Sequence, residues 1–174
     1  LPYSFAPPVN TGVSANRADS PIHDFDRNGQ STHTPPRPSA TARERNAYGG
    51  DCFGFGTFPG QYGFTVLSRL PIRTNEIRTF QKLLWRDMPG ADLPPEWYGP
   101  DALAALPLSS KSHWDLPFEL PVAPGAAPGA PPRVLHLLAS HPTPPGFDGP
   151  EDRNGRRNHD EIRLWADYLT PDRD

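Results

Sequence analysis

The sequence predicts an α/β fold, and two stretches near its C-terminal end carry that prediction. Residues 133–140 are apolar on both alternating faces, which is typical of a central strand covered on both sides. Residues 158–169 place apolar side chains at the spacing i, i+3, i+4 and i+7, which predicts an amphipathic helix packed on a sheet. These side chains are Ile162, Trp165, Ala166 and Leu169. The length of 174 residues suits one domain or part of a larger one.

The composition narrows the class of protein and its partners. Only 35% of the residues are hydrophobic, and 25 prolines join 15 glycines, which favours a folded domain with long, proline-stiffened loops. The net charge of −3 argues against strong binding to nucleic acid of any base sequence, because such binding comes from Lys and Arg side chains that neutralise phosphates. Nucleic acid is therefore a possible partner but not the favoured one. No membrane association is expected, since no stretch approaches the roughly 20 apolar residues of a spanning helix.

Residues 1–50 are predicted to be mostly loop, with Tyr3 and Phe5 at the end of a strand. Within them, residues 24–29 spell D-x-D-x-N-G, which is the opening of a calcium-binding loop. The twelfth position of such a loop holds Pro35 instead of the bidentate Glu of an EF-hand. We therefore interpret this segment as a simple turn and expect no tight calcium site.

Residues 62–80 predict a β-hairpin whose strands lie near 64–67 and 77–80. Just before it, residues 53–63 (FGFGTFPGQYG) combine glycines, which allow close backbone approach, with aromatic residues that can hold a polar tip such as Tyr62 in place. Two interpretations stay open for this segment. It lines a substrate groove, or it is an aromatic loop that fills the edge of a sheet.

The next part of the chain leads into the predicted central strand. Residues 83–108 predict short helical turns anchored by tryptophans such as Trp85. A strand is expected over 114–120, and residues 121–132 (PVAPGAAPGAPP) are an exposed low-complexity loop joining it to the strand at 133–140 as a hairpin.

His141 stands where the strand at 133–140 ends, and open α/β sheets place their chemistry at the carboxyl ends of strands. Three prolines within 142–145 stiffen the outgoing backbone, which makes His141 a candidate site residue. Asn158 is a candidate N-cap for the helix, with Glu161 three residues later as in a capping box.

These segments resemble a known family. The stretch SHPTPPGFDGPEDRNGRRNHDEIRLWADYL, at residues 140–169, is similar to the endonuclease/exonuclease/phosphatase superfamily and to its bacterial endonuclease/exonuclease/phosphatase family proteins. Other segments agree in order: APPVNTG at 6–12, FGFGTFPGQYG at 53–63, VLSRLPI at 66–72, FQKLLWRDMPGA at 80–91 and SSKSHWD at 109–115. The resemblance implies a four-layer α/β sandwich of the deoxyribonuclease I type, with two mixed sheets face to face and helices outside.

The resemblance also implies a function. It indicates a metal-dependent phosphoesterase that uses Mg²⁺ or Mn²⁺ to hydrolyse a phosphomonoester or phosphodiester substrate. His141 matches the family's strand-end histidine and would act as the catalytic residue that contacts the phosphate or assists the leaving group. The candidate substrate-binding residues are Lys111, His113, Arg157, Asn158 and Tyr62.

Several of these candidates also have a structural interpretation. Arg157 can bind a phosphate through two parallel hydrogen bonds, or it can fix the loop before the helix by pairing with a carboxylate such as Glu161. We favour the second, structural role. Asn158 is favoured as a helix cap. Lys111 fits a solvated charge at the start of a strand as well as it fits a phosphate contact.

The family's metal-binding motifs have no match in this sequence. The resemblance places a Glu-bearing strand motif before Leu1 and two further motifs, Gly-Asp-x-Asn and Ser-Asp-His, after Asp174. We therefore expect residues 1–174 to be the central part of one domain and inactive as a fragment. No metal ligand is assigned within the chain, and most are expected outside it.

A rival function comes from a different class. It is a non-enzymatic, extracytoplasmic binding module that calcium stabilises at residues 24–29. An extracytoplasmic location is also the one we favour for the protein.

Overall fold

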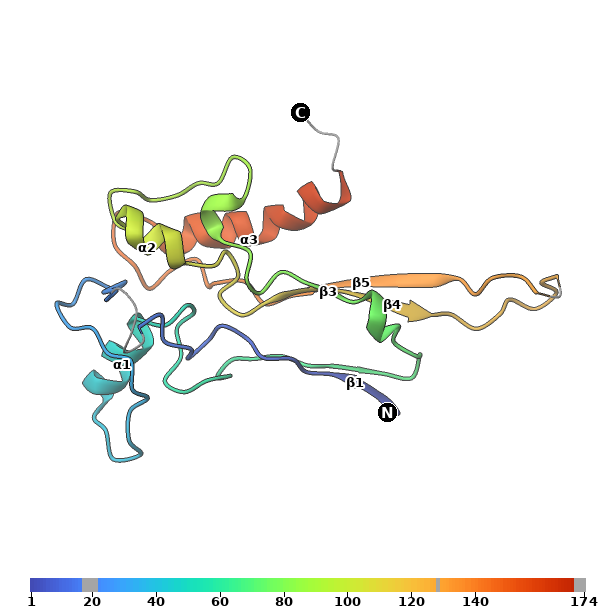
Figure 1. Ribbon diagram of the computed structural model, residues 1–174, viewed down its shortest axis with the longest axis horizontal. Helices are drawn as coiled ribbons and strands as arrows, with labels where there is room; N and C mark the ends of the chain where they lie inside the picture. The colour runs from blue at the N-terminus through green and yellow to red at the C-terminus, as the bar shows by residue number, and fades with distance from the viewer. Residues whose placement is uncertain (17–21, 128, 171–174) are drawn as a thin grey trace.

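The computed structural model describes residues 1–16, 22–127 and 129–170 (Figure 1). The elements along these residues are β1 (Tyr3–Phe5), α1 (Ala42–Gly50), β2 (Val66–Ser68), η1 (Thr74–Glu76), β3 (Arg78–Thr79), η2 (Trp85–Asp87), α2 (Pro100–Ala105), β4 (His113–Glu119), β5 (Val134–Ser140) and α3 (Arg153–Leu169). β1 pairs with β2, and β3, β4 and β5 form a second sheet in that order. None of the helices in these ranges combines the length and the apolar character that crossing a membrane requires.

The β4–β5 hairpin is the most extended part of the fold (Figure 1). Its antiparallel register runs from His113 opposite Ser140 to Glu119 opposite Val134. The connecting loop is exposed over residues 121–127, as predicted for the low-complexity segment. Both predicted strands and the hairpin that they form are therefore confirmed, with bounds that differ by one residue.

The buried strand of this sheet is β4, not β5. The first six residues of β4 are all buried, whereas β5 exposes Leu135 at 52% and Leu137 at 40%. Within the described ranges β5 pairs with β4 alone, so it lies at an edge. The prediction of a central strand covered on both faces at 133–140 was wrong, because a continuous apolar run also fits an edge strand whose outer side chains remain open. His136 of the same strand is also exposed.

The hairpin predicted over 62–80 does not form. β2 pairs with β1, where Phe5 lies opposite Val66, and β3 pairs with β4, so the two halves of the predicted hairpin belong to different sheets. The strand predicted around Tyr3 and Phe5 is confirmed as β1. Local sequence patterns indicate extended segments, but the choice of partner depends on long-range packing.

The two sheets face each other across an apolar layer, in agreement with an α/β class. This layer is formed by Phe5, Val9, Val66, Trp114, Leu116 and Phe118, with neighbouring partly buried residues. At its centre, the indole of Trp114 meets the ring of Phe5 edge-on at 5.1 Å and stacks on Phe64 at 3.9 Å between ring centroids.

Helix α3 covers the other face of the β3–β4–β5 sheet (Figure 1). Its Trp165 ring lies 6.0 Å from that of Phe80 and 5.2 Å from that of His113, and Trp165 Nε1 donates a hydrogen bond to Ser140 Oγ at 3.0 Å. The helix ends at Leu169 as predicted, but it begins at Arg153 rather than at 158.

The buried face of α3 is polar, which the apolar spacing did not predict. Ile162 and Leu169 of the predicted stripe are 56% and 65% exposed. The buried residues of the helix are Arg157, Asp160, Glu161 and Leu164. Hydrogen bonds of these polar side chains therefore join the helix to the loops beneath it.

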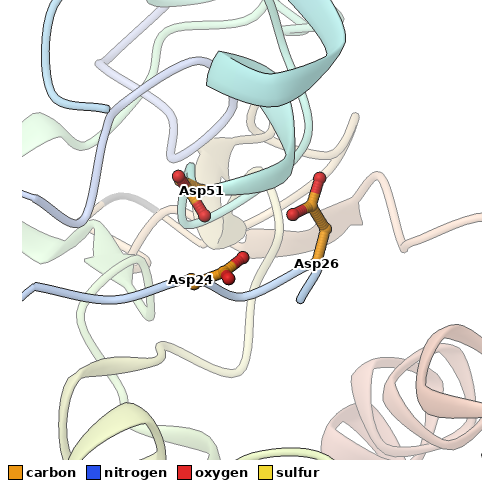
Figure 2. Close-up of side chains that lie close together, drawn as sticks. All are labelled: Asp24, Asp26 and Asp51. Atoms are coloured by element: carbon orange, nitrogen blue, oxygen red, sulfur yellow. The ribbon is translucent and has the colours of Figure 1, made fainter. Parts of the chain in front are cut away.

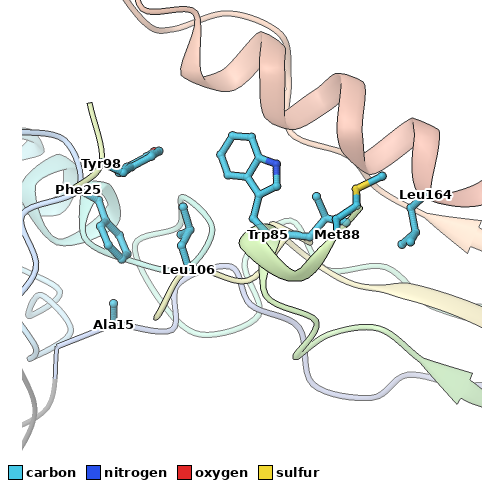
Figure 3. Close-up of a cluster of buried hydrophobic side chains, with 8 residues drawn as sticks. Ala15, Phe25, Trp85, Met88, Tyr98, Leu106 and Leu164 are labelled. Carbon is cyan, nitrogen blue, oxygen red and sulfur yellow. The ribbon is translucent and has the colours of Figure 1, made fainter. Parts of the chain in front are cut away.

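A second apolar cluster fills the space between α3 and the segments around 83–108 (Figure 3). Its buried members are Ala15, Phe25, Trp85, Met88, Tyr98, Leu106, Leu108 and Leu164. Trp85 is fully buried, as predicted for an anchor of this region.

Helix α1 was not predicted. The Thr41 side chain accepts from the Glu44 amide, and the Glu44 carboxylate accepts from the Thr41 amide, so that the two residues form a capping box. The helix buries only Tyr48 and Gly49, so no apolar period reveals it. The T-x-x-E pattern at 41–44 was the available signal.

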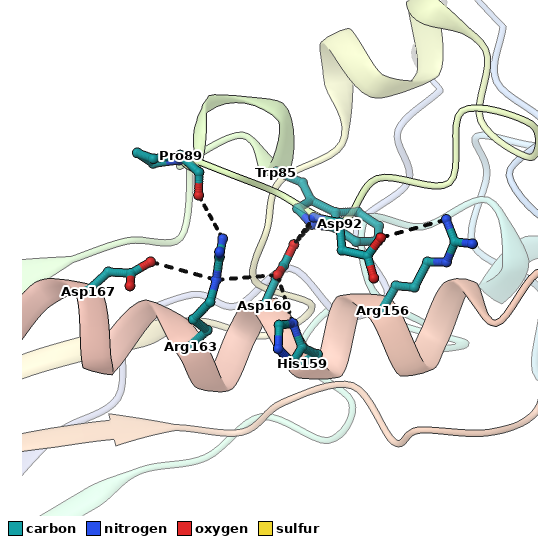
Figure 4. A network of polar contacts seen from close by, with 8 residues as sticks. All are labelled: Trp85, Pro89, Asp92, Arg156, His159, Asp160, Arg163 and Asp167. Carbon is teal, nitrogen blue, oxygen red and sulfur yellow. Dashed lines mark hydrogen bonds and ion pairs between the residues drawn. The ribbon is translucent and has the colours of Figure 1, made fainter. Parts of the chain in front are cut away.

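Asp160 ties α3 to the segment around η2 (Figure 4). One oxygen of this fully buried carboxylate accepts hydrogen bonds from Trp85 Nε1 and from the Asp92 amide, each at 2.7 Å. The other oxygen lies 3.6 Å from Arg163 Nε.

We expect Asp160→Ala to lower the free energy of unfolding by about 3 kcal/mol, because it leaves buried N–H donors without acceptors. Asp167→Ala is the matched control: Asp167 pairs with the same Arg163 at 3.7 Å, but its side chain is 49% exposed. The substitution Asp167→Ala should change the free energy of unfolding by less than about 1 kcal/mol. Urea denaturation of the two variants measures the difference, and equal losses would contradict the role given to Asp160.

Candidate active site

One cleft, with a volume of about 650 Å³, collects most of the predicted site residues. Tyr62, Lys111, His141 and Arg157 line it, whereas His113 and Asn158 do not. The cleft also has lining residues for which the sequence predicted no role in a site, among them Asn46, Phe147, Arg153 and Asn154. Asp26 of the D-x-D-x-N-G loop and Phe55 of the glycine-rich stretch at 53–63 line it as well.

The segment that carries Lys111 is tightly held. A Cβ at Gly54 would lie 1.9 Å from the Ser110 carbonyl oxygen, so only glycine fits there. This confirms the close backbone approach predicted for the glycine-rich stretch. From the other side, the Asn10 side-chain amide donates to the Ser109 carbonyl at 2.7 Å, and the Asn10 backbone amide donates to the Lys111 carbonyl at 2.9 Å.

Lys111 is a buried cation, not a solvated one. It is 5% exposed, and its Nζ donates to the Pro142 carbonyl at 3.0 Å and to Ser110 Oγ at 3.2 Å. Burial lowers the pKa of Lys111, and the charge of Glu161 opposes that shift. Because an ammonium has three donors and two are used, one remains for an anion in the cleft.

His141 directly follows β5, as predicted, lines the cleft and is exposed to solvent. Its ring meets Phe64 edge-on at 6.3 Å. Partial burial and the positive charge of Lys111 lower the pKa of His141, against the opposing effects of a hydrogen bond to the Tyr62 backbone and of the Glu161 charge. The imidazole is therefore neutral at neutral pH and able to accept a proton.

Glu161 was expected to belong to a capping box, but it lies fully buried beside the cleft. Its Oε1 accepts from the Ser110 amide at 2.7 Å and from Ser110 Oγ at 3.0 Å, and its Oε2 accepts from the Thr143 amide at 2.5 Å. These partners lie 51 and 18 residues away in the chain, so no local pattern indicates them.

Two of the predicted substrate-binding residues have their polar groups engaged within the protein. His113 is fully buried, with Nδ1 2.6 Å from Ser109 Oγ and Nε2 2.7 Å from the Glu161 carbonyl oxygen. Asn158 lies inside α3, so it is not the N-cap that the sequence predicted. Its side-chain amide donates to the Thr143 carbonyl at 2.6 Å.

Arg157 lines the cleft, yet its guanidinium binds backbone carbonyls. Nε donates to Leu108 at 2.9 Å, and Nη2 donates to Phe53 and to Pro107, each at 2.7 Å. This geometry favours the structural role over the phosphate fork. The partners are carbonyl oxygens, however, not the carboxylate that the sequence suggested.

Three exposed aromatic side chains line the cleft. Phe55, Tyr62 and Phe147 line it and are 50%, 52% and 93% exposed. Tyr62 and Phe147 also have positive φ angles of 63° and 64°. This conformation costs a non-glycine residue about 1–3 kcal/mol and is concentrated at functional sites.

Three carboxylates gather beside the cleft (Figure 2). Asp24 and Asp26 come from the D-x-D-x-N-G loop, Asp51 follows α1, and their oxygens lie within 4.8 Å of one another. Burial raises the pKa of Asp51 to about 6, and the charges of Asp26 and Asp24 add to the shift. Asp26 lines the cleft itself. Such hard oxygen donors suit Mg²⁺ or Ca²⁺.

The same loop is also a turn, as the sequence predicted. The Asp24 carboxylate accepts from the Asn28 amide at 3.0 Å and from the Gly29 amide at 2.8 Å. The calcium-loop pattern places its last ligand at position 35, which is Pro35, and so does not indicate Asp51, which follows α1.

A model of the Endonuclease/Exonuclease/phosphatase family matches residues 13–173. The chain belongs to this family. Members of the family are generally hydrolases that act on phosphate esters or nucleic acids, and they generally use divalent metals. Comparisons with curated proteins and with solved structures gave no match.

Proposed function

We propose that this chain forms the substrate-binding side of a metal-dependent phosphoesterase site that hydrolyses phosphomonoesters or phosphodiesters. The observation that supports this most strongly is the convergence of Lys111 and His141 on one cleft, in a family whose members act on phosphate esters. The domain would be a four-layer α/β sandwich.

The roles of the two residues follow from their surroundings. Lys111 would bind a phosphoryl oxygen. Its ammonium is buried, so water screens its charge less than it would at the surface. His141, neutral and more exposed, would hydrogen-bond the phosphate or move a proton at the leaving-group oxygen.

The exposed aromatic side chains of the cleft would contact the organic part of the ester. Tyr62 and Phe147 present exposed rings from strained backbone positions in the cleft lining. A flat or apolar alcohol group would cover these rings while the phosphate reaches the polar floor.

A divalent metal, Mg²⁺ or Mn²⁺, would offset phosphoryl charge and orient the attacking water. By its donor chemistry, the group formed by Asp24, Asp26 and Asp51 fits a hard cation. Asp26 is the only carboxylate among the described residues that line the cleft. We propose that most of the metal's ligands come from residues outside this chain.

The test is hydrolysis of bis-p-nitrophenyl phosphate and p-nitrophenyl phosphate by the full-length protein with Mg²⁺ or Mn²⁺. We expect turnover that EDTA abolishes and that added metal restores. Absence of turnover with both esters, or turnover that EDTA does not affect, would count against the proposal.

The 174-residue chain by itself is expected not to hydrolyse these esters, because most metal ligands are placed outside it. The measurement is the same assay on purified chain 1–174 with Mg²⁺, Mn²⁺ or Ca²⁺. Metal-dependent turnover that is lost in His141→Ala would show that a complete ligand set lies within these residues, and Asp24, Asp26 and Asp51 would be its first candidates.

A further inference from the structure

The segments that carry Lys111 and His141 meet at one buried carboxylate. Glu161 accepts from the backbone and side chain of Ser110, the residue before Lys111, and from the amide of Thr143, two residues after His141. The two segments also touch directly, since Lys111 Nζ donates to the carbonyl of Pro142.

We propose that Glu161 is a positioning residue that fixes Lys111 and His141 relative to each other. It is fully buried and does not line the cleft, so it acts through these segments and not on a substrate. The catalytic meaning of this role rests on the proposed phosphoesterase function, but the role itself is a property of the fold.

The charge of Glu161 is part of this role. Three donors satisfy its two oxygens, and no neutral side chain of the same shape reproduces that arrangement, because the amide of a glutamine would turn N–H groups towards one of the donors. The negative charge also raises the pKa of both Lys111 and His141, opposing the effect of burial.

Asp160, the preceding residue, is a natural control. It is equally buried and also accepts from a backbone amide and a side-chain N–H, but its partners, Trp85 and Asp92, do not line the cleft. Asp160→Asn therefore perturbs a buried carboxylate of the same helix without touching the segments of Lys111 and His141.

The first experiment follows the His141 imidazole by NMR as pH is varied, in the 174-residue chain and its variants. The groups facing His141 are Lys111, Glu161 and the Tyr62 backbone. In Glu161→Gln the apparent pKa of His141 should move to a lower value, because the charge that raises it is gone. Asp160→Asn should leave the titration unchanged. If Glu161→Gln does not fold, Glu161→Asp, which draws the charge back by one methylene, takes its place with the same expected direction.

The second experiment measures kinetics of the full-length protein with bis-p-nitrophenyl phosphate. Glu161→Gln should lower kcat by about 10²-fold with a smaller change in KM, the scale typical of misplaced catalytic groups. Asp160→Asn, assayed below its melting temperature, should retain kcat.

An unchanged His141 titration in the Glu161 variant, or the same shift in Asp160→Asn, would overturn the inference whatever the turnover. A wild-type kcat in a folded Glu161→Gln enzyme would also overturn it. A shifted titration in a protein that hydrolyses no phosphoester would instead support the positioning role and remove the proposed function.

Discussion

His141→Ala is expected to lower kcat of the full-length protein by about 10²–10⁴-fold, the range typical of a lost acid–base group. The residue lines the cleft and is exposed, so folding should be little affected. Steady-state hydrolysis of bis-p-nitrophenyl phosphate at saturating metal measures the loss.

His136→Ala is the matched control for this change. His136 lies on β5, the strand that His141 follows, and its Nδ1 is 2.6 Å from Asp115 Oδ1, but it does not line the cleft. Its removal should leave kcat unaltered. Turnover of His141→Ala near that of the wild type, or an equal loss in both variants, would refute the catalytic assignment of His141.

Arg157→Lys is expected to lower the free energy of unfolding of the 174-residue chain by about 3–5 kcal/mol. The guanidinium donates hydrogen bonds to three backbone carbonyls, those of Phe53, Pro107 and Leu108. A lysine has a single donor centre and cannot span the same fork, so buried carbonyl oxygens would lose their partners. Chemical denaturation followed by tryptophan fluorescence measures the change.

Arg156→Lys provides the comparison. Arg156 is the neighbouring residue of α3, its side chain is 31% exposed, and its ion pairs with Glu96 and Asp92 are 3.4 and 3.8 Å long. Such a pair contributes little, so the substitution should change stability by less than about 1 kcal/mol. A stable Arg157→Lys variant with weakened substrate binding would favour the phosphate fork over the structural role.

Together, these substitutions separate the two kinds of residue that share the cleft. His141 should affect turnover without affecting stability, and Arg157 should affect stability first. Both residues match the same family segment, and the sequence favoured a catalytic role for His141 and a structural role for Arg157. The difference follows from what each side chain touches.

By itself the sequence determined the features that are encoded locally. The strands at β4 and β5, the proline-rich loop between them, the position of His141 at a strand end and the close approach at Gly54 were all predicted. Each depends on a run of neighbouring residues, such as an apolar stretch, a proline cluster or a glycine between aromatic residues. The segments that resemble the endonuclease/exonuclease/phosphatase family are contiguous too, and the family model confirms that resemblance.

The tertiary structure decided which residues far apart in the sequence contact one another. Glu161 reaches Ser110 across 51 positions, Arg157 reaches Phe53 across 104, and Asp51 joins a loop whose own pattern ends at Pro35. A buried charge must find hydrogen-bond partners, but its own sequence neighbourhood does not say which ones, because packing selects them from the whole chain. The apolar spacing of α3 therefore did not reveal that Arg157, Asp160 and Glu161 are buried.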